Sequence, residues 1–146
     1  MSQKITYRSP KSTQDFEQYY DLRWRILRKP WNQPKGSEIV KEDTEAFHIM
    51  AEIDGELVGV GCIHEIDGNI GRIRFVGVDE EYQKRGIAKQ IMQILEDYAR
   101  VQGLKKIRLW AREIAWDFYL GQGYKIIGDG DLLFGVIKHK IMEKEL

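Results

Sequence analysis

Six consecutive residues have the composition of a phosphate-binding site: Gln83-Lys84-Arg85-Gly86-Ile87-Ala88. The first N–H groups of a helix have no partner within the helix, and the aligned peptide dipoles place partial positive charge there. Gly86 has no Cβ atom, so a large anion can approach the backbone closely. Lys84, Arg85 and Lys89 add positive charge that is unfavourable at a helix start unless an anion offsets it. The stretch therefore predicts a phosphate-binding turn.

The flanking residues predict the elements that position this turn. An apolar run with β-branched residues ends at Val78, which predicts a buried strand over 70–78. After the turn, apolar residues at helical spacing predict a long amphipathic helix that begins between Gln83 and Gly86. These residues are Ile87, Ile91, Ile94, Leu95 and Tyr98. A helix start that contains a glycine and binds no ligand is the alternative reading of this stretch.

The stretch 83–88 resembles the Q/R-x-x-G-x-G/A signature of the GCN5-related N-acetyltransferase (GNAT) superfamily, whose members hold the pyrophosphate of acetyl-coenzyme A there. A second resemblance to the same family follows at 115–124, where the family has a short helix before the penultimate strand. Its matching residues are Ala115, Phe118, Tyr119, Gly123 and Tyr124. Two signatures in the expected order favour family membership over a chance match.

The resemblance implies an α/β fold with a mostly antiparallel sheet of six or seven strands, a splayed central parallel pair and flanking helices. The coenzyme lies in the opening, where the backbone of Val76 would face the acetyl carbonyl and that of Val78 the pantetheine arm. Gly77 is predicted to form a bulge or, alternatively, to relieve crowding. The residues placed at the coenzyme are Val76, Val78, Gln83, Lys84, Arg85, Gly86, Ile87, Ala88, Arg112, Ala115 and Phe118. Phe118 is also expected in the core, and no metal is expected.

Tyr119 matches the position of the family's general-acid tyrosine. A phenol with its ordinary pKa near 10 stays protonated at neutral pH and can donate to a leaving sulfur. A tyrosine that only packs against the coenzyme is the alternative. The general base stays open, because some members place a glutamate where Arg72 stands here, and an arginine cannot act as a base. The other candidates are His48, His64, Glu65 and His139, or no dedicated base.

Arg72 and Arg74 lie two residues apart, on one face of the predicted strand. If that face lines the acceptor site, the two guanidinium groups can bind a carboxylate or phosphate of the substrate. Surface ion pairs are the alternative, with Glu65, Asp67 or Glu80 as partners. The resemblance also places segment 22–30, rich in arginine and aromatic residues, at the wall of the acceptor site. Arg112 stands near the family's usual asparagine and is expected to replace its coenzyme contact.

The remaining elements follow from periodicity and turn residues. A helix is predicted from Ser12 or Thr13 to about Arg28, with a capping box formed by Ser12 and Asp15. The glycines at 59 and 61 predict close packing or a bulge. The expected strands are 5–8, an antiparallel meander of 46–53, 57–64 and 70–78, then 106–111 parallel to 72–78, and finally 124–127 and 132–142.

The 146 residues are expected to form a single domain over 1–146. The single cysteine, Cys62, excludes an internal disulfide, is expected to be a buried apolar filler, and fits a reducing compartment. Lys4, Arg8 and Lys11 interrupt any signal-peptide pattern, and no apolar stretch reaches membrane-spanning length. A cytoplasmic location without membrane contact is therefore expected.

Charge is unevenly distributed, although the net charge is zero. Residues 38–81 carry three Lys/Arg and twelve Asp/Glu, a balance of −9, whereas residues 83–112 carry eight and two, a balance of +6. The basic block suits a coenzyme with several phosphates. A nucleic-acid-binding face is the rival explanation, but the strand 106–110 alternates, so only part of the block can face one way.

The sequence therefore predicts an acetyl-CoA-dependent N-acetyltransferase that acts on a primary amine of a small molecule or protein by direct attack in a ternary complex. A coenzyme-A-binding sensor or regulatory subunit without catalysis is the alternative, and a nucleic-acid-binding module is a third. The partners expected are acetyl-CoA and an amine acceptor, with no nucleic acid. A homodimer is left open.

Overall fold

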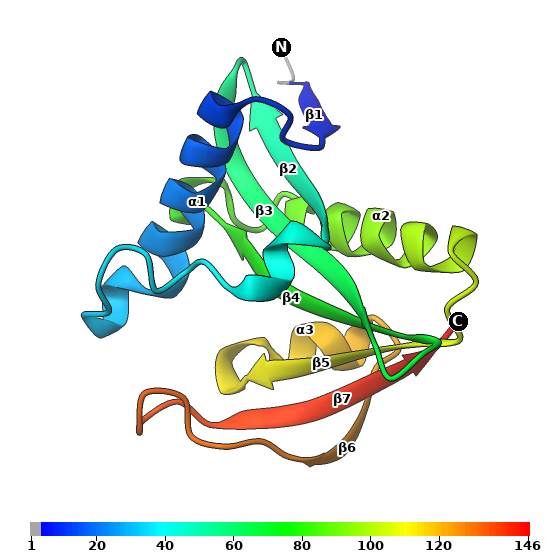
Figure 1. Ribbon diagram of the computed structural model, residues 1–146. Coiled ribbons are helices and arrows are strands. Elements are labelled where there is room, and N and C mark those ends of the chain that lie inside the picture. The colour runs from blue at the N-terminus through cyan, green and yellow to red at the C-terminus, as the bar shows by residue number, and fades with distance from the viewer. Residues whose placement is uncertain (1–3) are drawn as a thin grey trace.

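The computed structural model describes residues 4–146, which build one seven-stranded sheet in the order β1-β2-β3-β4-β5-β7-β6 (Figure 1). Only β4 and β5 are parallel neighbours. The strands are β1 (Ile5–Arg8), β2 (Phe47–Ile53), β3 (Glu56–Ile66), β4 (Ile70–Val78), β5 (Lys106–Arg112), β6 (Lys125–Asp129) and β7 (His139–Glu145). The helices are α1 (Thr13–Leu27), α2 (Ile87–Val101) and α3 (Trp116–Gly121). The predicted fold class, with its meander and central parallel pair, is confirmed.

Helices α1 and α2 cover opposite faces of the sheet, because successive strand residues alternate between two apolar clusters. Met50 and Val60 pack with Tyr19 and Leu22 of α1. Strand residues of the opposite phase pack with α2 in the larger core, and they include Ile49, Ala51, Ile53 and Val58. Helix α1 begins at the predicted capping box, in which Ser12 and Asp15 satisfy each other's backbone N–H groups.

The glycines of β3 allow α2 to approach the sheet closely. A Cβ atom at Gly61 would lie 2.7 Å from Cγ2 of Ile91, and one at Gly59 would lie 3.0 Å from Ile87. Both isoleucine side chains are buried in the core. Both alternatives for these glycines are observed, because the register between β2 and β3 also shifts next to Gly59.

Strands β4 and β5 are paired only where they begin, over 70–72 and 106–108, and diverge beyond that point. The expected parallel pairing of these two strands is thus confirmed, and it is confined to their first residues. Figure 1 shows β4 and β5 meeting near the C-terminus and separating away from it. The unpaired lengths of both strands border one opening, with the end of α1 beside it.

A bulge interrupts β4 next to this opening. Arg74 pairs with Cys62 and Gly77 pairs with Val60, so Phe75 and Val76 together face one residue of β3. Phe75 has a φ of 55°, in the left-handed region. The prediction of a bulge at Gly77 is therefore wrong.

Gly77 instead relieves crowding against α1, which was the alternative. A Cβ atom there would lie 3.2 Å from Cγ2 of Ile26. The glycine thus lets α1 pack directly on the strand that carries the bulge.

Two predicted boundaries are also wrong. Helix α2 begins at Ile87, because Lys84 and Gly86 have φ values of 65° and 81°, which a helix cannot contain. The strand predicted over 132–142 is instead β7 (His139–Glu145). Phe134 and Gly135, with φ values of 54° and 72°, turn the chain before it.

None of the helices in residues 4–146 combines the length and the apolar character needed to cross a membrane.

Candidate active site

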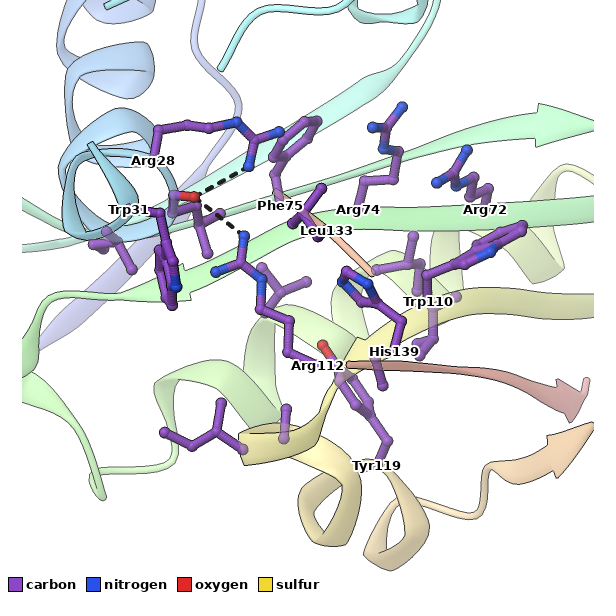
Figure 2. Close-up of a pocket in the computed structure, with 18 of the residues that line it drawn as sticks. Arg28, Trp31, Arg72, Arg74, Phe75, Trp110, Arg112, Tyr119, Leu133 and His139 are labelled. Carbon is purple, nitrogen blue, oxygen red and sulfur yellow. Dashed lines mark hydrogen bonds between the residues drawn. The ribbon is translucent and has the colours of Figure 1, made fainter. Parts of the chain in front are cut away.

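A cavity of about 500 Å³ lies where β4 and β5 diverge (Figure 2). The end of α1, the bulge of β4, the unpaired end of β5, α3 and the loop 131–133 contribute to its wall. Five of the predicted site residues line it: Val76, Gln83, Arg112, Ala115 and Tyr119. The strand divergence and the bulge therefore bring Gln83 of the first signature and Ala115 and Tyr119 of the second to one cavity.

The other predicted site residues lie outside this lining. Val78 ends β4, and its carbonyl accepts a hydrogen bond from Nε2 of Gln83 at 3.3 Å. The side chains of Ile87 and Ala88 pack in or against the core, so only their backbone can contact a ligand. Phe118 also packs against the core, edge to face with Tyr119. Lys84, Arg85 and Gly86 are exposed in the turn before α2.

The start of α2 has the features of an anion site. No side chain caps it, and no acidic residue occupies its first turn. The residue before the helix, Gly86, adopts a left-handed conformation, as does Lys84 two positions earlier. A Cβ atom at Gly86 would meet nothing within 4 Å, so its φ of 81°, rather than protein crowding, explains the glycine. The first N–H groups of α2 are thus left available to a ligand.

Tyr119 points from α3 into the cavity (Figure 2). Within residues 4–146 its hydroxyl has no hydrogen-bond partner, although the ring packs edge to face on Phe118 and Tyr124. Burial raises the pKa of Tyr119 to about 12, and the nearby positive charge of Arg112 partly opposes this rise. The phenol is therefore protonated at neutral pH and free to donate.

Of the four candidates for a general base, only His139 lines the cavity, at the first residue of β7. Its Nδ1 lies 3.2 Å from the carbonyl oxygen of Asp131. Glu65 accepts a hydrogen bond from the N–H of Asn69 in an exposed hairpin. Burial, with Arg72 and Arg74 nearby, lowers the pKa of His64, which lies outside the lining.

His48, the fourth candidate, belongs to a buried polar network between α1 and the sheet. Its Nε2 lies 2.8 Å from the carbonyl oxygen of Asp43, which can only accept, so Nε2 carries the proton. Its Nδ1 lies 2.8 Å from the hydroxyl of Tyr19. Arg23 donates to Asp43 and Tyr19, and approaches the sulfur of Cys62 at 3.6 Å. This network holds α1 to the sheet, and Cys62 is buried as predicted.

The rest of the lining is aliphatic or consists mainly of arginine and aromatic side chains that contact one another. Arg72 lies over Trp110 at 4.0 Å, and Arg112 over Trp31 at 4.7 Å, measured from guanidinium carbon to ring centroid. Arg28 lies over the bulge residue Phe75 at 5.3 Å, and so does Arg74 at 4.8 Å. The sequence indicated segment 22–30, which contains Arg28, as a wall, but Trp110 was missed, because only the tertiary fold brings it to the cavity.

Comparison with known proteins identifies the family. The profile of the acetyltransferase (GNAT) family matches residues 16–124. The chain belongs to this family. An acetyltransferase from Pectobacterium atrosepticum is 34% identical over 102 residues, which are 68% of this chain and 71% of the relative. The predicted family is thus confirmed.

Solved structures show the same fold as this GNAT chain. ElaA from Escherichia coli has a TM-score of 0.82 at 19% identity, with 99% of this chain and 100% of that one covered. A GNAT family acetyltransferase from Elizabethkingia anophelis with acetyl-CoA bound has a TM-score of 0.77 at 17% identity, with 97% and 98% covered. The divergent strands of this chain therefore belong to the fold that these solved structures share.

Proposed function

We propose that this protein transfers an acetyl group from acetyl-CoA to a primary amine of a small molecule or protein, by direct attack in a ternary complex. The observation that carries the proposal is the interrupted strand beside the cavity. Phe75 and Val76 have no register partner on β3 or β5, and Tyr119 lines the same cavity. Acetyl-CoA supplies the acetyl group as a thioester, whose C–S bond breaks as the acceptor nitrogen bonds to the carbonyl carbon.

The residues fit this coenzyme at both ends. The uncapped start of α2, with left-handed Lys84 and Gly86, suits a diphosphate. A strand edge that is not paired with another strand can hold the pantetheine arm by backbone hydrogen bonds. On the edge of β4 that faces away from β3, Val76 and Val78 would provide them. In this arrangement the N–H of Val76 stabilises the negative charge that develops on the carbonyl oxygen.

Tyr119 would act as the proton donor to the departing sulfur. The raised pKa of about 12 keeps its hydroxyl protonated, and Arg112 stabilises the phenolate that forms transiently when the proton leaves. The amine must attack in its neutral form. His139 is the candidate on the cavity wall that could accept the proton released from the amine nitrogen, directly or through water.

Two measurements test the proposal. Free thiol should appear when the protein is mixed with acetyl-CoA and a panel of primary amines, which separates an enzyme from a sensor that only binds the coenzyme. Acetyl-CoA, but not an oligonucleotide, should raise the melting temperature, which separates both from a nucleic-acid-binding module. Thiol release at the uncatalysed rate with every amine would contradict the proposal.

A charge reversal tests the coenzyme site separately. Lys89 is exposed in the first turn of α2. Lys89→Glu favours the helix itself but repels a diphosphate, so acetyl-CoA should bind roughly tenfold more weakly without loss of stability. Lys105→Glu, at another exposed lysine, is the matched control and should keep the affinity. Equal affinities for the two variants would place the diphosphate elsewhere.

The described strands share one sheet, which supports a single domain over 1–146. The cytoplasmic location and the oligomeric state stay predictions.

A further inference from the structure

The cavity wall carries more positive charge than its own acidic residues can balance. Four arginines line it, Arg28, Arg72, Arg74 and Arg112, and the one carboxylate residue in the lining is Asp131. Arg28 and Arg112 both donate to the carbonyl oxygen of Leu27 (Figure 2). These two guanidinium groups are thus held in place by the backbone, whereas Arg72 and Arg74 are not.

Arg72 is the clearest case of a guanidinium without a counter-ion. Its register partner on β5 is Arg108, which binds Glu143 at 2.6 Å. Arg72 has no carboxylate partner within residues 4–146, and its buried Nε makes no hydrogen bond. Burial, and then the charge of Arg74, lower the pKa of Arg72 to about 10. A guanidinium kept half-buried, stacked on Trp110 and unpaired is an unfavourable arrangement unless a ligand completes it.

Arg74 is only weakly compensated. Its nearest carboxylate oxygen belongs to Glu42, at 4.0 Å, too far for a hydrogen bond. None of the ion-pair partners considered from the sequence binds either arginine: the ion pairs within residues 4–146 include neither Glu65, Asp67 nor Glu80 with them. Arg72 and Arg74 therefore present their donors from the same face of β4 toward the cavity.

The coenzyme does not account for this pair. Arg72 precedes Val76 by four residues along β4, which is roughly 13 Å at the usual strand rise. The turn at 84–88 lies beyond Val78, at the opposite end of the same strand. Phosphates held at the start of α2 are consequently far from Arg72. What reaches Arg72 is a molecule that enters on the acceptor side of the acetyl group.

We infer that the acceptor is a small amine that also carries an oxyanion, a carboxylate or a phosphonate-like group, and that Arg72 and Arg74 bind this group while the amine faces Val76. This inference rests on the proposed function. A planar guanidinium over Trp110 matches an oxyanion in two-point contact, and the second arginine adds charge. The cavity volume of about 500 Å³ is in the range of small-molecule sites, which favours a small acceptor.

Acceptor pairs that differ only in the distant group test the inference. Amino acids are compared with their carboxamides, and ω-aminoalkanoates of two to six carbons with the matching aminoalkylphosphonates and diamines. The carboxylate of each matched pair should show a kcat/KM roughly 10- to 100-fold above that of the carboxamide. The kcat/KM values of the aminoalkylphosphonates show whether a carboxylate or a phosphonate is preferred. Carboxamides or diamines that react as well as carboxylates would overturn the inference.

Variants then assign the preference to residues. Arg72→Gln and Arg74→Gln should each lower the carboxylate-to-carboxamide ratio of kcat/KM roughly tenfold or more, through a higher KM for the anionic amine. Arg100→Gln is the matched control, because Arg100 is an exposed residue of α2 paired with Asp97, and it should keep the ratio. A ratio that is unchanged in both cavity variants would refute the assignment.

Different results would contradict the proposed function and the inference about the acceptor. If acetyl-CoA neither binds nor releases thiol with any amine, the proposed function fails. If thiol is released but without preference for anionic amines, only the inference fails. If acetyl-CoA binds but no amine reacts, N-acetylated amino acids are added to the CoA complex. They should raise its melting temperature in the wild type and less in Arg72→Gln, and N-acetylated carboxamides should not. Equal shifts would again overturn the inference.

Discussion

Two arginines on the same side of the sheet have opposite surroundings. Arg23 is fully buried, and its guanidinium binds Asp43 and the carbonyl oxygen of Glu38 at 2.9 Å and the hydroxyl of Tyr19 at 3.1 Å. Arg72 lies on the cavity wall with an aromatic ring below it and no acidic partner in the described chain. Nε of each arginine is buried without a hydrogen-bond partner, so the difference lies in the ion pair: the fold gives the first guanidinium a carboxylate and leaves the second without one.

The pKa shifts of the two residues differ for the same reason. Burial acts to lower the pKa of both guanidinium groups. At Arg23, Tyr19, Cys62 and Asp43 more than offset burial, and its pKa is raised. At Arg72, burial is reinforced by Arg74 and only partly opposed by Glu42, which forms no ion pair with it, and the pKa falls to about 10. Burial alone therefore does not distinguish a structural arginine from a binding one, but the presence of partners does.

The largest effect is expected when the buried ion pair of Arg23 with Asp43 is removed. Arg23→Met leaves the carboxylate of Asp43 buried and unpaired, so the free energy of unfolding should fall by about 3–5 kcal/mol. Urea unfolding monitored by circular dichroism measures it. Arg25→Met removes only solvent-accessible ion pairs, with Asp21 and Asp79, and should cost less than about 1 kcal/mol.

The same substitution at the open site should act in the other direction. Arg72→Met removes a charge that has no counter-ion, so stability in the absence of ligands should be unchanged or higher. If Arg72→Met is as destabilising as Arg23→Met, the contrast between the two residues is wrong.

The next effect concerns catalysis rather than stability. Tyr119→Phe should lower kcat by about 100-fold or more, because the proton donor is lost. Unfolding should change by less than about 1 kcal/mol, since the hydroxyl makes no hydrogen bond within residues 4–146. A phenol with a pKa of about 12 carries its proton below that pH and loses it above, so the wild-type rate should not fall between pH 7 and 10. Stopped-flow thiol release across this range measures both rates, and equal rates would exclude Tyr119 as the donor.

Local sequence predicted the parts of the site that are built locally. The strand, turn and helix around 84–88 follow from periodicity and from Gly86. The left-handed φ of Lys84 could not be predicted, because lysine has no preference for that conformation. The pairing of Arg72 with Arg74 on one face followed from the two-residue repeat of a strand. That Arg72 has no carboxylate partner, while Glu143 binds its register neighbour Arg108, is a matter of contacts between distant segments that spacing does not reveal.

Predictions from local sequence were wrong where tertiary packing determined the conformation instead. A glycine in a strand suggested a bulge at Gly77, but the packing of Ile26 explains that glycine, and the bulge falls on Phe75 and Val76. The last strand was placed too early, because the apolar residues 132–137 look extended although Phe134 and Gly135 form a turn. Leu132 and Leu133 line the cavity, and Leu132 and Val136 are exposed rather than packed in the core.

A smaller effect is expected on the face of the sheet that α2 covers. Gly61→Ala places a Cβ atom 2.7 Å from Ile91, which is completely buried, so overpacking should cost about 1–3 kcal/mol. Gly128→Ala in β6, where a Cβ atom would meet nothing within 4 Å, is the control and should change stability by about 0.5 kcal/mol or less. If urea unfolding gives equal stabilities for the two variants, α2 can move away from the sheet without a loss of stability. Helix α1, held by the contacts of Arg23, would then differ from α2 in this respect.

The smallest effect is a pH dependence of the completed network. Burial, with Arg23 nearby, holds the pKa of His48 below its ordinary 6.5, although the hydrogen bond to Asp43 acts the other way. Below pH 6.5 the unfolded chain therefore binds more protons than the folded one at this residue. The contribution of His48 is complete above pH 6.5 and is lost as the pH falls toward its folded pKa.

Unfolding free energies at pH 7.5, 6.5 and 5.5 for the wild type and His48→Gln isolate this term, since His64 titrates in both proteins. The wild type should lose more stability than the variant between pH 6.5 and 5.5. Parallel losses in the two proteins would mean that the proton on His48 is tolerated beside Arg23. The network would then keep its structure with a second positive charge. The difference between Arg23 and the cavity arginines Arg72 and Arg74 would in that case be one of contacts and not of tolerance for charge.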